Sequence, residues 1–248
     1  MNLIETESFK LATYSKGDES SDKLALVLPG KLDTKDYAHM TSHVDYLASL
    51  GFLALSFDPP GTWESPGDIT LYTTTNYLKS INELINYYGN KPTFVMGHSR
   101  GGSMAMLSGT TNPDITSFAA LMSYAYRSRF ESEETKKWKE KGSIESSRDL
   151  PPGGGPKVKK FKLPYSFHED QIQYDMNKGL KTSTKPKLFM LGKKDDLVPP
   201  KFVKDAYELA GEPKELYEID SIHDYRLDPK WIDEVNKVVG KFIKNYHV

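Results

Sequence analysis

The chain has 248 residues, of which 38% are hydrophobic, and its 33 Lys and Arg nearly balance its 34 Asp and Glu, which leaves a net charge of −1. This length allows one sizeable α/β domain with a substantial core, and the near-neutral balance gives no support for nucleic acid or an acidic membrane surface as an obligatory partner. The absence of cysteine excludes disulfides, thiolate metal sites and a cysteine nucleophile.

The N-terminal residues do not have the pattern of a signal peptide. Met1 to Glu7 carries acids where a signal peptide has a basic segment followed by an apolar run. No apolar stretch of the sequence approaches the length of a membrane span. We therefore expect a soluble, cytoplasmic protein, and the sequence gives no indication of its oligomeric state.

The first half of the chain alternates between strand and helix patterns. Alternating side chains predict a half-exposed edge strand at 8–14, and a continuous apolar run predicts a strand buried on both faces at 24–28. This alternation predicts a mostly parallel sheet with right-handed crossovers. The other elements predicted in this half are a helix at 36–50, a buried strand at 52–57, a helix at 75–88, a strand at 93–96, a helix that opens at 103–107 and a strand at 118–123.

An insertion is predicted at 127–186, where the alternation breaks. Residues 127–187 contain fifteen Lys and Arg against nine Asp and Glu. They also contain the run Pro151 to Pro156, whose composition is incompatible with regular structure. We expect this insertion, helical around 132–141 and 168–178, to form a lid on the single domain 1–248.

The composition of the insertion leaves two questions open. Its positive charge either favours acidic substrates or keeps the lid soluble. Its aromatic side chains either line a pocket or pack the lid onto the body. These aromatic residues are Trp138, Phe161, Tyr165, Phe167 and Tyr174.

The alternation of strands and helices resumes after the insertion. Strands are predicted at 187–191 and 215–219, and helices at 200–209 and 229–246. The predicted fold class is therefore α/β, with a mostly parallel central sheet flanked by helices.

The sequence Gly-His-Ser-Arg-Gly at 97–101 joins a predicted strand to a predicted helix. A serine at its centre occupies a sharp, strained turn, and Gly97 and Gly101 leave room for the neighbouring strand and helix to approach. The N-terminus of the helix also favours an anion that develops at Ser99. Ser99 is therefore the predicted nucleophile, and the alternative is a plain turn with a serine near the helix cap.

Candidates for an acid and a base follow the last two predicted strands. Asp195 and Asp196 follow the strand at 187–191, and His223 follows the strand at 215–219. Because reactive groups gather at the carboxyl ends of parallel strands, we expect these side chains near Ser99. The chain order is Ser, Asp, His.

With these motifs the sequence resembles the α/β-hydrolase fold family, whose triad follows in this order. The resemblance covers nearly the whole chain outside the insertion. The Gly-x-x-Asp-x-x-Val-Pro form of residues 192–199 implies that Asp195 is the acid, and the position of His223 before the last helix implies that it is the base. Asp58 opens an Asp-Pro-Pro-Gly sequence where the family has an Asp-x-x-Gly turn, and we expect it to stabilise that turn.

The resemblance also implies an oxyanion hole made of two backbone donors. One is expected to be the N–H of Arg100, the residue after the nucleophile. The second is expected in the loop after the strand at 24–28, where the family often has His-Gly followed by the donating residue. Here the sequence is Pro29-Gly30-Lys31-Leu32, so the donor is expected at Lys31, with Leu32 as the alternative.

The predicted function is that of a serine hydrolase that acts on a small to medium carboxylic ester. His223 would take the proton of Ser99 as it attacks the carbonyl, Asp195 would stabilise the imidazolium, and water would hydrolyse the acyl-enzyme. No metal or organic cofactor is implied. A thioesterase, a peptidase, an acyltransferase or a non-enzymatic binding protein of the same fold remain alternatives, because the fold does not choose the substrate.

The other histidines have simpler predicted roles. His98 is expected to pack or bond locally. His168 is expected to lie on the surface of the insertion, with a place in the lining of the pocket as the alternative. His39 and His43 stand four apart on a predicted helix, which is a spacing that can pair two ligands on a metal. Without a third ligand nearby or a Glu between them, no metal site is predicted.

Overall fold

A computed structural model describes residues 2–125 and 132–246. Its strands are β1 (Asn2–Glu5), β2 (Lys10–Lys16), β3 (Leu24–Leu28), β4 (Leu53–Phe57), β5 (Thr93–His98), β6 (Ile115–Leu121), β7 (Ser143–Asp149), β8 (Val158–Pro164), β9 (Lys187–Gly192) and β10 (Lys214–Ile219). Its helices are α1 (Ala38–Ser49), α2 (Thr74–Tyr87), α3 (Arg100–Thr111), α4 (Glu133–Lys141), α5 (Ser166–Gln171), α6 (Asn177–Thr182), α7 (Pro200–Leu209) and α8 (Pro229–Tyr246), with short 3₁₀ turns η1 (Ile69–Leu71) and η2 (Tyr225–Leu227).

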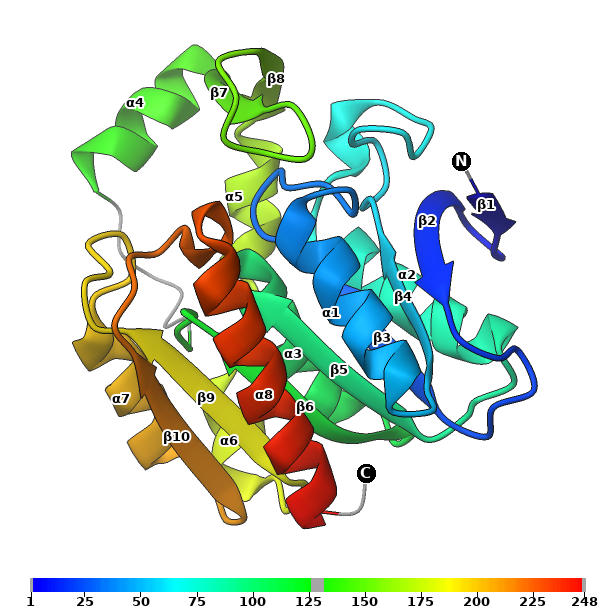
Figure 1. Cartoon of the computed structure of the whole chain (residues 1–248). Coiled ribbons are helices and arrows are strands. Elements are labelled where there is room, and N and C mark those ends of the chain that lie inside the picture. Colours follow the sequence, from blue (N-terminus) through cyan, green and yellow to red (C-terminus); the bar gives the residue numbers. More distant parts are fainter. Residues whose placement is uncertain (1, 126–131, 247–248) are drawn as a thin grey trace.

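The central sheet has eight strands in the order β1-β2-β4-β3-β5-β6-β9-β10 (Figure 1). Every neighbouring pair from β4 to β10 is parallel, whereas β1 and β2 are antiparallel to their neighbours. The predicted fold class is therefore confirmed. This topology aligns the carboxyl ends of β5, β9 and β10, which carry the three predicted catalytic residues.

The predicted edge strand at 8–14 is wrong in its position. It appears as β2, which lies inside the sheet between β1 and β4. β1 supplies the edge instead, and its four residues bury Ile4 but expose Leu3. A strand this short carries too little alternation to stand out in a sequence.

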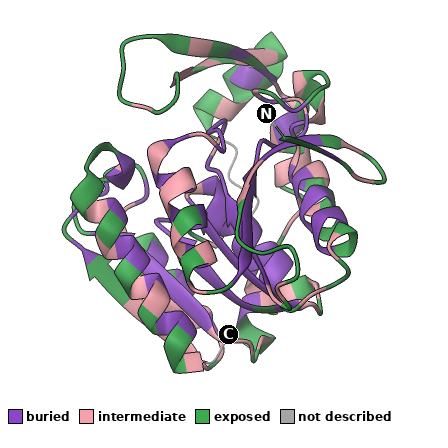
Figure 2. Cartoon of the chain, turned by 45° about the vertical axis from the view of Figure 1, so that its right-hand side comes forward, coloured by how far each residue is buried: buried purple, intermediate pink, exposed green. Residues whose placement is uncertain are grey.

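Helices cover the sheet on both faces. α1 and α8 pack on one face, where their apolar residues join one buried cluster, and α2, α3 and α7 contribute to the cluster on the other face. Figure 2 shows the central strands as the most buried part of the chain. β3, β4 and β5 are buried at every position, which explains their unbroken apolar runs.

The segment between β6 and β9 contains α4, a separate antiparallel pair β7–β8, α5 and α6. The predicted helix at 132–141 is confirmed as α4, but the predicted helix at 168–178 is wrong, because α5 and α6 are separate short helices. The Pro-Gly run at 151–156 lies in the loop that joins β7 to β8. Residues 127–131 of the predicted insertion lie outside the described residues, and a role as a lid stays a prediction.

Buried aromatic side chains attach this segment to the body. Phe161 meets the ring of Trp63 edge to face, with centroids 5.6 Å apart. Phe167 stacks on Tyr72 at 5.3 Å and on Trp138 at 6.1 Å. Aromatic pairs at these distances add to the stabilisation from apolar burial, so these side chains pack the segment onto the body.

Asp149, the last residue of β7, makes a second attachment through polar groups. Arg226 donates two hydrogen bonds of 2.9 Å to its carboxylate, and the hydroxyl of Tyr37 donates another of 2.9 Å. Burial alone would raise the pKa of Asp149, but the bonds from Arg226, from the Gly154 N–H and from Tyr37 lower it to about 2. This carboxylate therefore stabilises the fold in its charged form.

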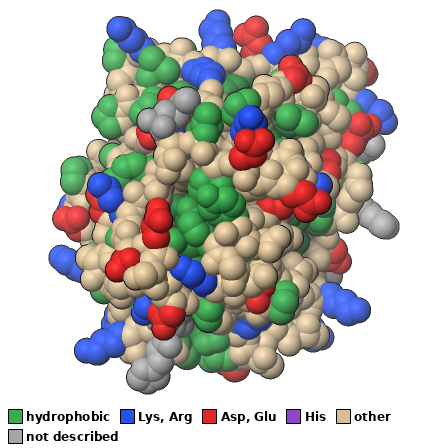
Figure 3. Space-filling view, turned by 90° about the vertical axis from the view of Figure 1, so that its right-hand side faces the viewer, with side chains coloured by type: hydrophobic (Ala, Val, Ile, Leu, Met, Phe, Trp, Pro, Cys, Tyr) green, Lys and Arg blue, Asp and Glu red, His purple; other side chains and the backbone are tan. Residues whose placement is uncertain are grey.

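Figure 3 shows acidic and basic side chains interspersed over one face of the molecule. Among the residues described, no helix has both the length and the apolar composition that crossing a bilayer requires.

We predict that Asp149→Asn lowers the free energy of unfolding by about 2 kcal/mol at pH 7, because the hydrogen bonds lose a charged acceptor. The folded pKa of about 2 lies below the ordinary 3.8, so the stabilisation is present at neutral pH and is lost as the pH falls through the folded value. Urea unfolding should show the difference between variant and wild type shrinking from pH 5 to pH 3. Asp233→Asn, at an exposed position, is the control, and equal effects of the two substitutions would contradict the prediction.

Candidate active site

Ser99 lies on the turn that joins β5 to α3, with φ 52° and ψ −119°. This is a conformation that side chains other than Gly rarely adopt. A Cβ at Gly97 would overlap with the backbone of Gly101, and a Cβ at Gly101 would overlap with the carbonyl of Leu28. The two glycines are therefore required for the close approach of β3, β5 and α3, as the sequence pattern predicts.

Asp195 and His223 meet above the carboxyl ends of β9 and β10. Asp195 Oδ2 lies 2.7 Å from His223 Nδ1. The other carboxylate oxygen accepts the N–H groups of Leu197 and Val198, at 3.0 and 2.7 Å, so that the carboxylate is held in place. Asp196 is exposed, which supports the choice of Asp195 between the two neighbours.

The third member of the predicted triad lies beside this pair without a direct bond to it. The ring of His98, the residue before Ser99, lies 4.7 Å from the ring of His223, and His98 Nε2 bonds to the His223 carbonyl at 3.0 Å. Among the described residues, no hydrogen bond joins the Ser99 hydroxyl to His223, and His223 Nε2 has no hydrogen-bond partner. Catalytic hydrogen bonds are often absent or long before substrate binds.

The two predicted oxyanion donors in the loop after β3 differ in their hydrogen bonds. The Leu32 N–H donates to the hydroxyl of Tyr72 at 3.0 Å, so it is already occupied. The Lys31 N–H makes no hydrogen bond with a described residue, and Arg100, as the first residue of α3, has no helical partner for its N–H. Two unoccupied donors therefore lie close to the Ser99 turn.

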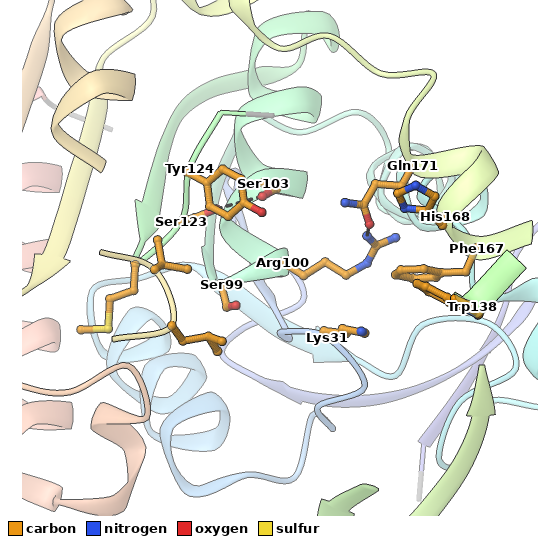
Figure 4. Close-up of a pocket in the computed structure, with 13 residues that line it drawn as sticks. Lys31, Ser99, Arg100, Ser103, Ser123, Tyr124, Trp138, Phe167, His168 and Gln171 are labelled. Carbon is orange, nitrogen blue, oxygen red and sulfur yellow. Dashed lines mark hydrogen bonds between the residues drawn. The ribbon is translucent and has the colours of Figure 1, made fainter. Parts of the chain in front are cut away.

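A pocket of about 260 Å³ opens at Ser99. In Figure 4, Ser99 lies between two groups of side chains: one contains Lys31, Arg100, Trp138, Phe167, His168 and Gln171, and the other contains Ser103, Ser123 and Tyr124. The volume suits a small substrate rather than a long acyl chain. A larger cavity of about 730 Å³ shares Tyr124 with the pocket, but Ser99 does not line it.

The aromatic residues of the insertion were expected either to line a pocket or to pack the insertion onto the body. Trp138 and Phe167 line the pocket and are also buried against the body, so they serve both purposes. His168 is half-buried and lines the pocket as well, which is the alternative to the surface position expected for it. Its place results from the turn of α5 beside Phe167, which sequence spacing alone does not specify.

Two side chains of the site were not singled out as pocket residues from the sequence. The guanidinium of Arg100 is buried and lies 4.3 Å from the Phe167 ring centre. Tyr72 holds the loop that carries Lys31. Neither has a local sequence signal, because both act through contacts between elements that lie far apart in the chain.

Three buried histidines stand behind the Ser99 turn. His43 bonds to Asn236 at 2.6 Å and to Tyr225 at 2.8 Å, which excludes it as a metal ligand partner for His39. Burial, with the neighbouring His223 and His39, lowers the pKa of His98 well below its ordinary value. His98 is therefore neutral, and its bond to the His223 carbonyl confirms the local role predicted for it.

Two groups of side chains bring possible metal ligands within 4.8 Å of one another. In the group Asp36, Asp58 and Glu64, the ammonium of Lys35 lies 2.6 Å from Asp36 and from Glu64 and 3.6 Å from Asp58, and so supplies the cation itself. Asp58 also accepts the Lys35 N–H and the Thr34 hydroxyl, which confirms its role in fixing this turn.

The second group is Asp33, His39 and His98. Arg148 already neutralises Asp33, with Nε 3.1 Å from the carboxylate, and the charge of Arg226 adds to the positive field at His39. A divalent cation would meet these fixed positive charges at close range, which disfavours its binding.

Comparison with known proteins supports the architecture. A family model described as alpha/beta hydrolase fold matches residues 26–142. Among solved structures, Est1E from Butyrivibrio proteoclasticus with bound ferulic acid superposes with a TM-score of 0.76 at 19% identity, covering 99% of each chain. Alpha/beta hydrolase domain-containing protein 10 from mouse gives a TM-score of 0.78 at 18% identity over 98% of each chain.

This protein has the alpha/beta hydrolase fold. The Pyrococcus furiosus esterase Pf2001 is also similar, with a TM-score of 0.70 at 21% identity, covering 99% of this chain and 91% of that chain. Among curated proteins, none matches the sequence significantly. At these identities the similarity to solved structures establishes the fold alone. The chemistry of this protein depends on the residues of its site.

We predict that Tyr72→Phe lowers the free energy of unfolding by about 1–3 kcal/mol, because it leaves the buried Leu32 N–H without an acceptor. Tyr87→Phe is the matched control, since Tyr87 is 56% exposed. Chemical denaturation measures both variants. If the two substitutions have the same effect, the Tyr72 hydroxyl does not hold the loop.

Proposed function

We propose that this protein is a serine hydrolase that cleaves small to medium carboxylic esters through an acyl-enzyme on Ser99. The observation that carries the proposal is the Asp195–His223 hydrogen bond of 2.7 Å, which leaves Nε2 of the imidazole without a partner among the described residues. The same imidazole lies 4.7 Å from the ring of His98, the residue before the strained Ser99. A base oriented by a carboxylate, next to a serine that lines a pocket, is the arrangement that activates a hydroxyl nucleophile.

Each group in the site has a defined role in the proposed reaction. The Ser99 hydroxyl turns toward His223 Nε2, transfers its proton to the imidazole and attacks the ester carbonyl. Asp195 stabilises the imidazolium, which then returns the proton to the departing alcohol. Water deprotonated by His223 hydrolyses the acyl-enzyme and releases the acid.

The oxyanion of each tetrahedral intermediate is held by the N–H groups of Arg100 and Lys31 in this proposal. Neither donor bonds to another group in the described part of the chain, and Arg100 stands at the positive end of α3. Preorganised donors of this kind each accelerate acyl transfer by roughly 10²- to 10³-fold. The reaction needs no metal or organic cofactor, and we propose that it takes place in the cytoplasm.

A fluorophosphonate probe tests the nucleophile. We predict covalent labelling of Ser99, detected by mass spectrometry of the modified peptide. Labelling should disappear in Ser99→Ala and persist in Ser108→Ala, since Ser108 lies on the same helix with its hydroxyl bonded to Met104. Labelling at another residue, or none in the wild type, would contradict the proposed mechanism.

A matched pair of carboxylate variants tests the acid. We predict that Asp195→Asn lowers kcat for p-nitrophenyl acetate by roughly 10³- to 10⁴-fold, because the imidazole loses the carboxylate that fixes its tautomer. Asp196→Asn, at the exposed neighbour, should stay within about threefold of the wild type. Similar losses in the two variants would remove Asp195 from the mechanism.

A substrate panel separates the ester hydrolase from its rivals. p-Nitrophenyl esters, acyl-CoA thioesters and aminoacyl amides can be compared by kcat/KM with the same preparation. We expect the esters to be turned over fastest. A higher kcat/KM for thioesters or amides would make the protein a thioesterase or a peptidase on the same triad.

A further inference from the structure

Two cationic side chains share one side of the pocket at Ser99. Figure 4 shows the Lys31 ammonium and the Arg100 guanidinium together beside Trp138 and Phe167. Lys31 comes from the loop after β3, and Arg100 from the first turn of α3. Their convergence is created by the fold, because sixty-eight positions separate them in the sequence.

Lys31 has no acidic partner among residues 2–125 and 132–246. Its Nζ lies 5.8 Å from the Trp138 ring centre and 5.7 Å from that of Phe167, and it makes no hydrogen bond or ion pair with a described residue. Lys35, four residues further along the same loop, has three carboxylates around it. A half-buried ammonium without a carboxylate is costly unless a ligand supplies one.

The positive charge of Arg100 also has no acidic partner among the described residues. The residue is 4% exposed, and its two terminal nitrogens donate to neutral acceptors, the Gln171 amide at 3.0 Å and the Thr74 hydroxyl at 3.1 Å. Its Nε is buried without a partner. The ring of Phe167 offers a cation–π contact at 4.3 Å, which does not cancel the charge.

Two acidic residues that are close in sequence to pocket residues bind other groups. Asp33 faces Arg148, with Nε 3.1 Å from its carboxylate. Asp170 accepts the N–H groups of Thr74 and Thr75, at 2.6 and 3.0 Å, at the start of α2. The two pocket cations are therefore left for a group that enters from solvent.

We propose that the pocket takes esters that carry a carboxylate, and that Lys31 and Arg100 bind this carboxylate while Ser99 attacks the ester carbonyl. The inference rests on the proposed function and adds the substrate class. The anionic group belongs to the acyl part or to the alcohol part of the ester, and separate substrates distinguish the two.

Matched pairs of substrates test the proposal. For the alcohol part, 4-carboxyphenyl acetate is compared with 4-carbamoylphenyl acetate; for the acyl part, monoethyl adipate is compared with ethyl adipamate. We expect the wild type to prefer the carboxylate by kcat/KM in at least one pair. The ratio should fall by about 10- to 100-fold in Lys31→Met, as expected for loss of a charged hydrogen bond.

Lys139→Met is the matched control for charge. Lys139 lies on α4, exposed, with its ammonium 5.9 Å from the Tyr165 ring centre, and does not line the pocket. Its substitution should leave the ratio unchanged. An equal fall in both variants would mean that the general charge of the insertion attracts the substrate, which would overturn the proposed site.

The outcomes separate this inference from the proposed function. Turnover of the carbamoyl esters without preference for the carboxylates would overturn the inference and leave the hydrolase intact. Calorimetry of adipate with Ser99→Ala tests the anion site without catalysis. Saturable binding that weakens in Ser99→Ala/Lys31→Met supports the site even if no ester is hydrolysed, and absence of binding counts against it.

The pH dependence gives an independent check. Burial, with the positive charges of Arg100 and Arg148, lowers the pKa of Lys31 to about 8. The ammonium is therefore present below pH 8 and lost above it, whereas both arginines keep their charge and the substrate carboxylate stays ionised. His168 on α5 faces the same space, so profiles are compared between pH 7 and 9 in wild type and Lys31→Met. The carboxylate preference should fall with rising pH in the wild type, and an identical profile in the variant would exclude Lys31 as the titrating group.

Discussion

The close approach of β3, β5 and α3 around two glycines is the constraint on which the rest of the site depends. The backbone at Gly101 packs against Leu28 at the end of β3, and Gly97 packs against Gly101. This contact holds Ser99 in a conformation with positive φ. It also places the loop after β3 beside the first turn of α3, so that Lys31 and Arg100 both lie close to the Ser99 turn.

The central strands were predictable because each is marked by a short apolar segment of the sequence. The short, mainly apolar segments at 24–28, 52–57 and 187–191 are typical of strands covered on both faces, and each appears as a buried strand. Asp195 and His223 follow the strands predicted for them, and the structure joins their side chains by a hydrogen bond. The choice between Lys31 and Leu32 needed the Tyr72 hydroxyl, whose position no sequence pattern specifies.

The segment between β6 and β9 was less predictable for the opposite reason. β7 and β8 are polar, and their seven-residue register is set by pairing with each other rather than by a buried face. The helix expected at 168–178 is interrupted between α5 and α6, where tertiary contacts override the local pattern. The proximity of Lys31 and Arg100 was also not predictable, because it results from contacts between elements far apart in the sequence. A sequence shows which side chains are charged, but it does not show whether an opposite charge lies beside them.

The bond between Asp149 and Arg226 has a mechanical consequence. Arg226 stands three residues after His223, in the short turn that separates the predicted base from α8. Because Asp149 ends β7, the hairpin and the turn form one tethered unit through this pair. The two hydrogen bonds of this pair therefore couple the position of the β7–β8 hairpin to the position of the turn that follows His223.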